Sequence, residues 1–209
     1  MSATLEVRGL TKRFGGLTAV HDLDFGVAEG EILGMIGPNG AGKSTTFNVI
    51  AGAYPATSGS VRFAGEAILG LPPHDIARRG LMRTFQHNRP FAGMPVIDNV
   101  LVGAHTRYGA RLWSILLGAG GDEERERRRR ARELVEFVGL GELAEADVTT
   151  LSFGQGRLLE IARALAGEPR LILFDEPAAG LTPAECSRLA EIIRGIAARG
   201  IAVLLIEHD

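Results

Sequence analysis

The sequence predicts an α/β protein in which a mostly parallel sheet is flanked by helices and carries an inserted helical lobe. Near-continuous apolar runs, such as residues 171–174 and 201–206, alternate with stretches of helical spacing. Strands of this kind are buried on both faces, which indicates a parallel sheet covered by helices. Between about residues 88 and 150 the pattern of residue types changes, and charged residues at helical spacing predominate. The length of 209 residues fits one large domain, or one core with a smaller lobe.

The first part of the predicted core consists of short strands around a glycine-rich loop. Residues 5–10 and 17–27 are predicted strands, the second with alternating apolar side chains. The apolar run 31–36 ends in glycine and leads through a loop into a helical stretch that continues to about Ala51. After a turn, a further strand is predicted at 60–63.

One helix in the middle of the chain has predicted ends. Asp122 is the expected N-cap, and the acidic residues Glu123 and Glu124 after it are placed favourably for the helix dipole. Apolar residues then follow at helical spacing until Gly139, which is expected to end the helix. The segment 107–121 before this helix shows no clear pattern and is taken as a loop with a short helix.

The core is predicted to resume after the lobe. A helix is expected near 155–166, and a second helix at about 183–199 lies between the two apolar strands named above. We therefore assign residues 1–87 and 151–209 to the α/β core and residues 88–150 to the helical lobe.

Composition narrows the classes of function. With 45% hydrophobic residues, 23% charged residues and a formal net charge of −2, the chain resembles an ordinary folded protein with no reason to bind a polyanion. Cys186 is the only cysteine, so no internal disulfide is possible, which suits a reducing compartment. The first residues lack a secretory signal, and no apolar run approaches the roughly 18–20 residues that span a membrane. We expect a cytoplasmic protein that does not itself cross a bilayer.

A run of arginines from Arg125 to Arg132 is the most basic stretch of the chain. Glutamates interleave with it, at Glu126 and Glu133 among others. We therefore favour a solvated helix face with i,i+4 ion pairs over a nucleic-acid site.

The glycine-rich loop matches the phosphate-binding pattern G-x-x-x-x-G-K-[ST] at every fixed position. Its residues are Gly37, Pro38, Asn39, Gly40, Ala41, Gly42, Lys43 and Ser44, followed by Thr45. Glycines let several backbone N–H groups converge on a triphosphate, and the helix N-terminus that follows favours the anion. Lys43 can bridge the β- and γ-phosphates, and the Ser44 hydroxyl can bind Mg²⁺. The alternative is a plain glycine-rich turn, but the strand before the loop and the helix after it favour nucleotide binding.

Two acidic residues follow the apolar run 171–174. A buried strand that ends in carboxylates delivers them to the edge of the sheet where open α/β folds bind ligands. Asp175 is then expected to hold Mg²⁺, and Glu176 to polarise the attacking water. On their own, two acids after a strand are more often solvated loop residues. The phosphate loop upstream reverses that preference, and a general base points to hydrolysis.

With these two motifs in place, the whole chain resembles an ABC-type ATPase, which is a P-loop NTPase fold with an N-terminal antiparallel β region and a helical lobe. The segment Leu151-Ser152-Phe153-Gly154-Gln155 resembles the signature motif of that family, with Phe153 where glycine is commonest. The resemblance implies that this loop contacts the γ-phosphate of ATP held by an opposite subunit. An ordinary N-cap serine is the alternative interpretation of Ser152.

The resemblance also implies roles for residues that carry no signal alone. Gln86 is similar to the glutamine that touches Mg²⁺ or the lytic water, and His208 to the switch histidine that senses the γ-phosphate. Phe14 occupies the position of an aromatic residue that stacks on adenine, with Val20 beside it. Without the resemblance, Gln86 and His208 are ordinary loop residues and Phe14 is a core residue.

Within the family, four segments are similar to the subfamily that energises branched-chain amino-acid importers, with importers of urea and other small amides among its relatives. These segments are Gly15–Val20, Arg83–Gln86, Leu159–Leu165 and Asp175–Leu181. The resemblance implies an ATPase that uses ATP and Mg²⁺ and lies on the inner face of the cell membrane. Its implied partners are a second ATPase subunit, identical or not, two membrane permease subunits and, indirectly, an extracytoplasmic solute-binding protein.

Three features depart from the family pattern. Thr182 stands where many relatives have aspartate, which puts the cross-subunit role of that loop in doubt. Gly156-Arg157 after the signature is unusual. The sequence stops one residue after His208, where relatives continue with further strands and a helix, so a cassette lacking its usual C-terminal end is expected.

Three other classes of function stay open at this point. A soluble ABC ATPase of translation or DNA maintenance would share the catalytic motifs. A P-loop kinase would not need the segment 151–155. A nucleotide-binding module with little hydrolysis is the third.

Overall fold

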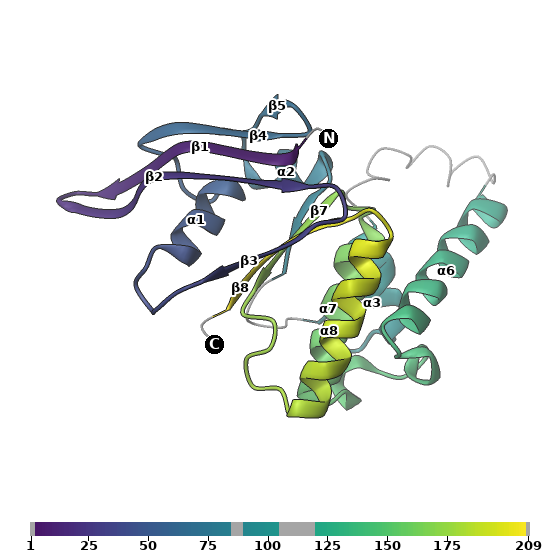
Figure 1. Cartoon of the computed structure of the whole chain (residues 1–209). Helices are drawn as coiled ribbons and strands as arrows, with labels where there is room; N and C mark the ends of the chain where they lie inside the picture. The colour runs from purple at the N-terminus through teal and green to yellow at the C-terminus, as the bar shows by residue number, and fades with distance from the viewer. Residues whose placement is uncertain (1–2, 85–89, 105–119, 208–209) are drawn as a thin grey trace. The chain divides into compact units, whose positions relative to one another are not determined.

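The computed structural model describes residues 3–84, 90–104 and 120–207, with the side chains of 120–122 excepted. The chain divides into two compact units (Figure 1). The first unit comprises Met1–Gln86, Pro169–Gly180 and Cys186–Asp209, and the second comprises His87–Glu168 and Leu181–Glu185. The α/β class predicted from the sequence is confirmed.

An antiparallel sheet forms the N-terminal part of the first unit. The strand order is β2-β1-β4-β5, with all neighbours antiparallel. A tight turn at Gly15, with a positive φ of 56°, joins the two long strands of the hairpin. The strands are β1 (Ala3–Phe14), β2 (Leu17–Ala28), β4 (Ser58–Phe63) and β5 (Glu66–Ala67).

The second sheet of this unit is parallel, in the order β3-β8-β7-β6. Its strands are β3 (Ile32–Ile36), β8 (Ala202–Glu207), β7 (Leu171–Asp175) and β6 (Leu81–Arg83). Every residue of β7 is buried. Because parallel strands run in the same direction, the carboxyl ends of all four strands lie at one edge of the sheet.

Helices cover both faces of the parallel sheet. Helices α1 (Lys43–Ile50) and α2 (Pro73–Arg78) contribute Phe47 and Ile76 to a core that also contains Leu173 of β7. Side chains alternate along a strand, so the buried Phe174 faces the opposite side, where α8 (Pro183–Ala198) buries its own apolar residues. The first three residues of α8 are assigned to the second unit.

The second unit is helical. Helix α3 packs against α6 and α7, which also touch each other. Its elements are α3 (Val96–Gly103), α6 (Gly120–Phe137), η1 (Gly141–Leu143), η2 (Val148–Thr150) and α7 (Phe153–Ala166). Gly103 must be glycine, because a Cβ atom there would overlap the carbonyl group of Arg163 on α7.

Two boundary predictions differ from the structure. Helix α6 begins at Gly120, so it starts before Asp122, the expected N-cap. It ends as predicted near Gly139, which has a positive φ of 77°. Helix α7 was assigned to the α/β core by sequence order, but it belongs to the helical unit because its apolar face packs on α3 and α6.

The arginine run lies on α6, where the predicted ion pairs form. Arg127 pairs with Glu123 at 2.6 Å, and Arg129 pairs with Glu133 at 2.5 Å, both four residues apart. Hydrogen bonds from Arg129 and Arg130 lower the pKa of Glu126 to about 2. The positive charges of these arginines are therefore balanced by glutamates on the same helix, as expected. In the part of the chain that the structure describes, no helix is long and apolar enough to cross a membrane.

Candidate functional site

Two of the predicted motifs lie at the ends of strands of the parallel sheet. The phosphate loop follows β3, the acid pair lies at the end of β7, and β8 between them ends at Glu207. In the register, Met35 of β3 and Asp175 of β7 both pair with Ile206 of β8. The topology therefore brings the phosphate loop and the carboxylates to one edge of the sheet within the first unit.

The phosphate loop curls through two glycines with left-handed backbone. Gly40 has a φ of 84° and Gly42 a φ of 89°. The N–H of Ala41 donates to the carbonyl oxygen of Pro38 at 3.2 Å, which closes the turn. Thr46 donates the first helical hydrogen bond of α1 to Gly42 at 2.9 Å. The N–H groups at the start of the helix therefore have no acceptor within it and face the loop, as an anion site requires.

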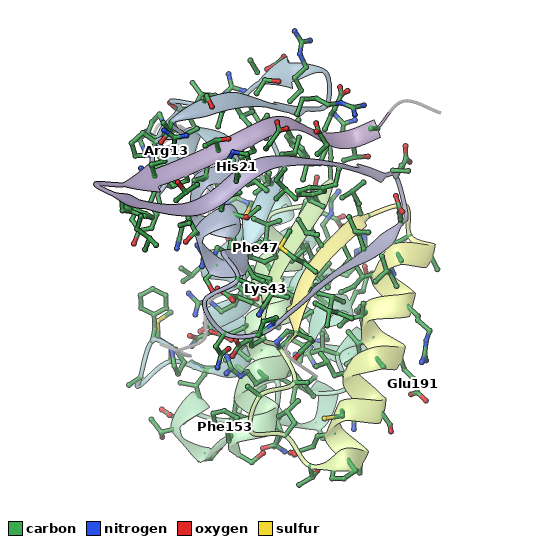
Figure 2. All side chains as sticks on the ribbon, turned by 60° about the vertical axis from the view of Figure 1, so that its left-hand side comes forward. Arg13, His21, Lys43, Phe47, Phe153 and Glu191 are labelled. Carbon is green, nitrogen blue, oxygen red and sulfur yellow. The ribbon has the colours of Figure 1, made fainter. Side chains whose placement is uncertain are left out.

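The side chain of Lys43 folds back over this loop (Figure 2). It is buried, with 7% of its surface exposed, and its Nζ donates to the carbonyl oxygens of Gly37 and, at 3.0 Å, Pro38. A positive charge is thus held inside the loop, where phosphate oxygens can replace the carbonyl groups as acceptors.

Strand β2 supports the loop from one side. A Cβ atom on Gly42 would overlap the carbonyl oxygen of Ala19 and lie 3.2 Å from Val20 Cγ2. Val20 itself is buried, and its side chain lies next to the backbone of the phosphate loop. The hairpin and the phosphate loop are therefore in van der Waals contact, with no space for a side chain between them.

Asp175 is buried at the end of β7, with 6% of its surface exposed. Its Oδ2 accepts a hydrogen bond from Arg83 Nη2 at 2.7 Å, while its Oδ1 is buried and has no hydrogen-bond partner among the residues that the structure describes. A buried carboxylate oxygen that lacks a partner is costly, because the charge has lost its water. This oxygen is therefore the one available for a ligand.

Glu176 has a left-handed backbone, with a φ of 48° that non-glycine residues seldom adopt. Its N–H donates to the carbonyl oxygen of Ile206 at 3.1 Å. The loop after it is tied to β8, because the Ala178 N–H donates to Glu207 Oε1 at 3.1 Å. Strained backbone of this kind persists where the surroundings hold it, often at functional sites.

Phe14 lies at the end of β1 and is not a core residue, since 43% of its surface is exposed. Its ring meets Tyr54 edge to face, with the centroids 5.7 Å apart, and the Lys12 ammonium lies 4.6 Å from its centroid. The ring is thus held by two neighbours with surface left open. Tyr54 could not be predicted from the sequence, since a lone tyrosine in a turn gives no signal.

The signature segment lies in the second unit, at the start of α7. Ser152 is the N-cap: its Oγ accepts from the Gln155 N–H at 3.2 Å, and Gln155 Oε1 accepts from the Ser152 N–H at 2.8 Å. This reciprocal pair is a capping box. The neighbouring Phe153 is 58% exposed, with the Arg157 guanidinium 5.1 Å from its ring. The N-cap interpretation of Ser152 is confirmed.

Thr182, which departs from the family pattern, has a structural role here. Its N–H and hydroxyl both donate to Glu185 Oε2 at 2.8 Å. These hydrogen bonds hold the pKa of Glu185 below its usual value. Threonine and aspartate both cap helices, so the substitution preserves the start of α8.

Two predicted residues, Gln86 and His208, lie outside the described residues. Within the described ones, no group of three or more His, Cys, Asp or Glu side chains comes together to hold a metal ion. A cation at this site would therefore depend on one carboxylate, hydroxyl groups and ligand oxygens, which is how Mg²⁺ commonly binds with nucleotides.

Comparisons with known proteins bear on the whole chain. A family model described as ABC transporter matches residues 20–179. The high-affinity branched-chain amino acid transport ATP-binding protein BraF of Pseudomonas aeruginosa is 46% identical over 208 residues, which cover 98% of this chain and 82% of that protein.

Solved structures agree with the sequence comparisons. The ADP conformation of an ATP-binding cassette of an ABC transporter superposes with a TM-score of 0.86 at 34% identity, covering 100% of this chain and 82% of that one. A dimeric ATP-binding cassette in a post-hydrolysis state, bound to ADP and Pi, has a TM-score of 0.79 at 25% identity, covering 98% of this chain and 88% of that one.

Proposed function

Because the chain belongs to the ABC transporter family, we propose that it is the ATP-hydrolysing subunit of an importer for branched-chain amino acids or related small amides. The observation that carries this proposal is the meeting of a phosphate loop and a buried acid, with a second acid next to it, at one edge of the parallel sheet. The similarity to BraF supports the class of solute.

The phosphate loop binds the triphosphate of ATP. Backbone N–H groups from Gly40 to Thr45 and the N-terminus of α1 attract the phosphate oxygens, and Lys43 exchanges its carbonyl acceptors for the β- and γ-phosphates. Phe14 offers its open ring face to adenine, with Val20 packed beneath the loop. Asn39 and Ala41 complete the loop.

The residues at the site fit a Mg²⁺ ion. Asp175 has a buried oxygen to which no described residue donates a hydrogen bond, and Ser44 at the start of α1 offers a hydroxyl. Gln86, outside the described residues, is proposed for the same ion. Bound Mg²⁺ would neutralise charge on the β- and γ-phosphates.

Glu176 polarises the water that attacks the γ-phosphate. Its left-handed backbone and its hydrogen bond to Ile206 hold the residue at the strand end, and the contact between Ala178 and Glu207 fixes the loop behind it. His208 follows the adjacent strand, outside the described residues, and is proposed to sense the γ-phosphate.

A second ATPase subunit, identical or not, completes the site. We expect the segment 151–155 of one subunit to meet the triphosphate bound by the other, with Ser152, Phe153, Gly154 and Gln155 at a helix N-terminus that favours anions. The similarity to a dimeric cassette bound to ADP and Pi supports a dimer. ATP then joins the two ATPase subunits at the inner face of the membrane, and hydrolysis releases them. Two transmembrane permease subunits convert this cycle into transport.

Solute uptake tests the transport function. Cells that lack this chain are expected to lose uptake of labelled leucine, and the wild-type chain is expected to restore it. The Glu176→Gln chain, expressed at the same level, should not restore uptake. If uptake of leucine, isoleucine and valine is normal without the chain, the branched-chain assignment is wrong, and urea uptake then tests the small-amide alternative.

Phe14→Ala is expected to weaken ATP binding by about 1–3 kcal/mol, because the stacking surface for adenine is lost. Phe14→Trp should retain it. Inorganic triphosphate, which has no base, is expected to bind both variants and the wild type equally, as measured by calorimetry. Equal ATP affinity in Phe14→Ala would exclude the ring from base recognition.

Ser152 permits a test that separates capping from catalysis. Ser152→Ala is expected to lower the free energy of unfolding by about 1 kcal/mol, because the cap is lost, whereas Ser152→Asp should preserve it. In the assembled transporter, Ser152→Asp is expected to hydrolyse ATP more slowly than Ser152→Ala, since its carboxylate repels the γ-phosphate. Denaturation and phosphate release measure the two effects. Wild-type hydrolysis by Ser152→Asp would place this loop away from ATP.

A further inference from the structure

Arg83 at the end of β6 has no role in the mechanism above, yet it contacts the acid at the centre of the site. Its side chain is 14% exposed. Nη2 donates to Asp175 Oδ2 at 2.7 Å, and Nη1 donates to Asn48 Oδ1 at 2.6 Å. The guanidinium thus joins β6, β7 and the helix α1 that begins in the phosphate loop.

We infer that Arg83 is a positioning residue that orients the Asp175 carboxylate towards the divalent cation and couples it to the phosphate-loop helix through Asn48. This inference rests on the proposed function, because it assigns a cation to Asp175. Arg83 can couple these elements because its two acceptors, Asn48 and Asp175, lie 35 and 92 residues away from it in the sequence.

The two oxygens of Asp175 have different surroundings. Oδ2 accepts the hydrogen bond from Arg83, and Oδ1 is buried with no partner in the described ranges 3–84, 90–104 and 120–207. Because the charged hydrogen bond holds one oxygen, the carboxylate cannot rotate to present both. Only Oδ1 remains to face the cation, so Arg83 determines which oxygen serves the ligand.

Arginine suits this place for a geometric reason. Its planar guanidinium holds several N–H donors in a rigid fork, so two acceptors on different elements keep a constant separation. A lysine ammonium carries the same charge but is a compact group on a flexible stem. It can pair with Asp175 and cannot span the same two acceptors with fixed geometry. Charge and geometry are therefore separable by substitution.

The experiment measures Mg²⁺ in the absence of turnover. A fluorescent ATP analogue is titrated into the Glu176→Gln protein, first in EDTA and then with increasing Mg²⁺. Arg83→Met is expected to raise the Mg²⁺ concentration for half-maximal binding on the order of 10–100-fold, the usual effect of losing a partner of a metal-binding side chain. Affinity in EDTA should stay unchanged, because it depends on the phosphate loop.

Two further variants keep the test decisive if Arg83→Met folds poorly. Asn48→Ala removes the second acceptor of Arg83 and leaves Asp175 unchanged. Arg83→Lys keeps the positive charge. Both are expected to raise the Mg²⁺ requirement, by less than Arg83→Met. The matched control is Arg79→Gln, which removes an arginine from an exposed ion pair with Glu66 at 3.1 Å and should behave as wild type.

The outcomes separate the inference from the proposed function. A wild-type Mg²⁺ requirement in Arg83→Met or in Asn48→Ala overturns the inference, while Mg²⁺-dependent binding by the parent protein upholds the function. Full recovery in Arg83→Lys would show that charge alone acts, and it also overturns the positioning role. If the parent protein binds no ATP, the proposed function itself fails.

Discussion

Replacing Glu176 with glutamine is expected to leave ATP binding intact and to slow phosphate release by roughly 10²–10⁴-fold, the usual contribution of a general base. Glutamine keeps the size of the side chain and still fills the left-handed position at the end of β7. It cannot accept the proton of the attacking water. Because ATP then persists between two subunits, the ATP-bound dimer is expected to last longer than that of the wild type.

The chain offers a closely matched control for this substitution. Glu168 also has a φ of 48°, and it lies after α7 in the second unit. Glu168→Gln therefore repeats the same chemical change at the same backbone conformation, at a residue that has no part in the proposed site. Phosphate release from ATP and size-exclusion chromatography with ATP measure both variants. Wild-type phosphate release in Glu176→Gln would remove this residue from the role of base.

Gly42→Ala is expected to abolish nucleotide binding and to destabilise the first unit. Alanine must adopt the φ of 89° at this position, which costs roughly 1–2 kcal/mol for a residue with a Cβ atom. In addition, its Cβ would overlap the Ala19 carbonyl oxygen on β2. Backbone cannot move aside as the end of a flexible side chain can, so the loop and the hairpin must separate.

Gly70→Ala is the control that isolates the steric clash from backbone strain. Gly70 has a φ of 85°, and a Cβ atom there would have no neighbour within 4 Å. The free energy of unfolding of this variant is expected to fall only by the cost of the left-handed backbone for alanine, roughly 1–2 kcal/mol. Its affinity for ATP should be unchanged. Thermal unfolding and ATP titration report both quantities. Equal behaviour of the two alanine variants would mean that contact with β2 does not support the phosphate loop.

Most strands and long helices of the fold could be predicted from the sequence. The apolar runs at 31–36, 171–174 and 201–206 became β3, β7 and β8 within a residue or two. Strand β6 was missed, because three residues, Leu81 to Arg83, are too few to show periodicity. Helix α7 was found but placed in the wrong unit, since its periodicity shows that one face is apolar and not which partner covers it.

The parts of the candidate site that could be predicted are those whose residues are adjacent in the sequence. The phosphate loop and the pair Asp175 and Glu176 are contiguous motifs, and the roles proposed for them await the tests above. In the sequence, Arg83 stands out only as part of a family segment, and Asn48 and Tyr54 carry no signal. Their importance comes from partners that are distant in the sequence, and no local pattern records such a partner.

The sequence by itself determined the local requirements of this protein: which segments are apolar at strand or helix spacing, where glycine is needed for a left-handed turn, and which residues can hold phosphate. The tertiary structure decided the pairings. Strand register set Asp175 beside Arg83, and the path of β2 left room for nothing larger than glycine at position 42. The physical reason is that backbone preferences act over a few residues, whereas hydrogen bonds and van der Waals contacts join whichever atoms the folded chain brings together.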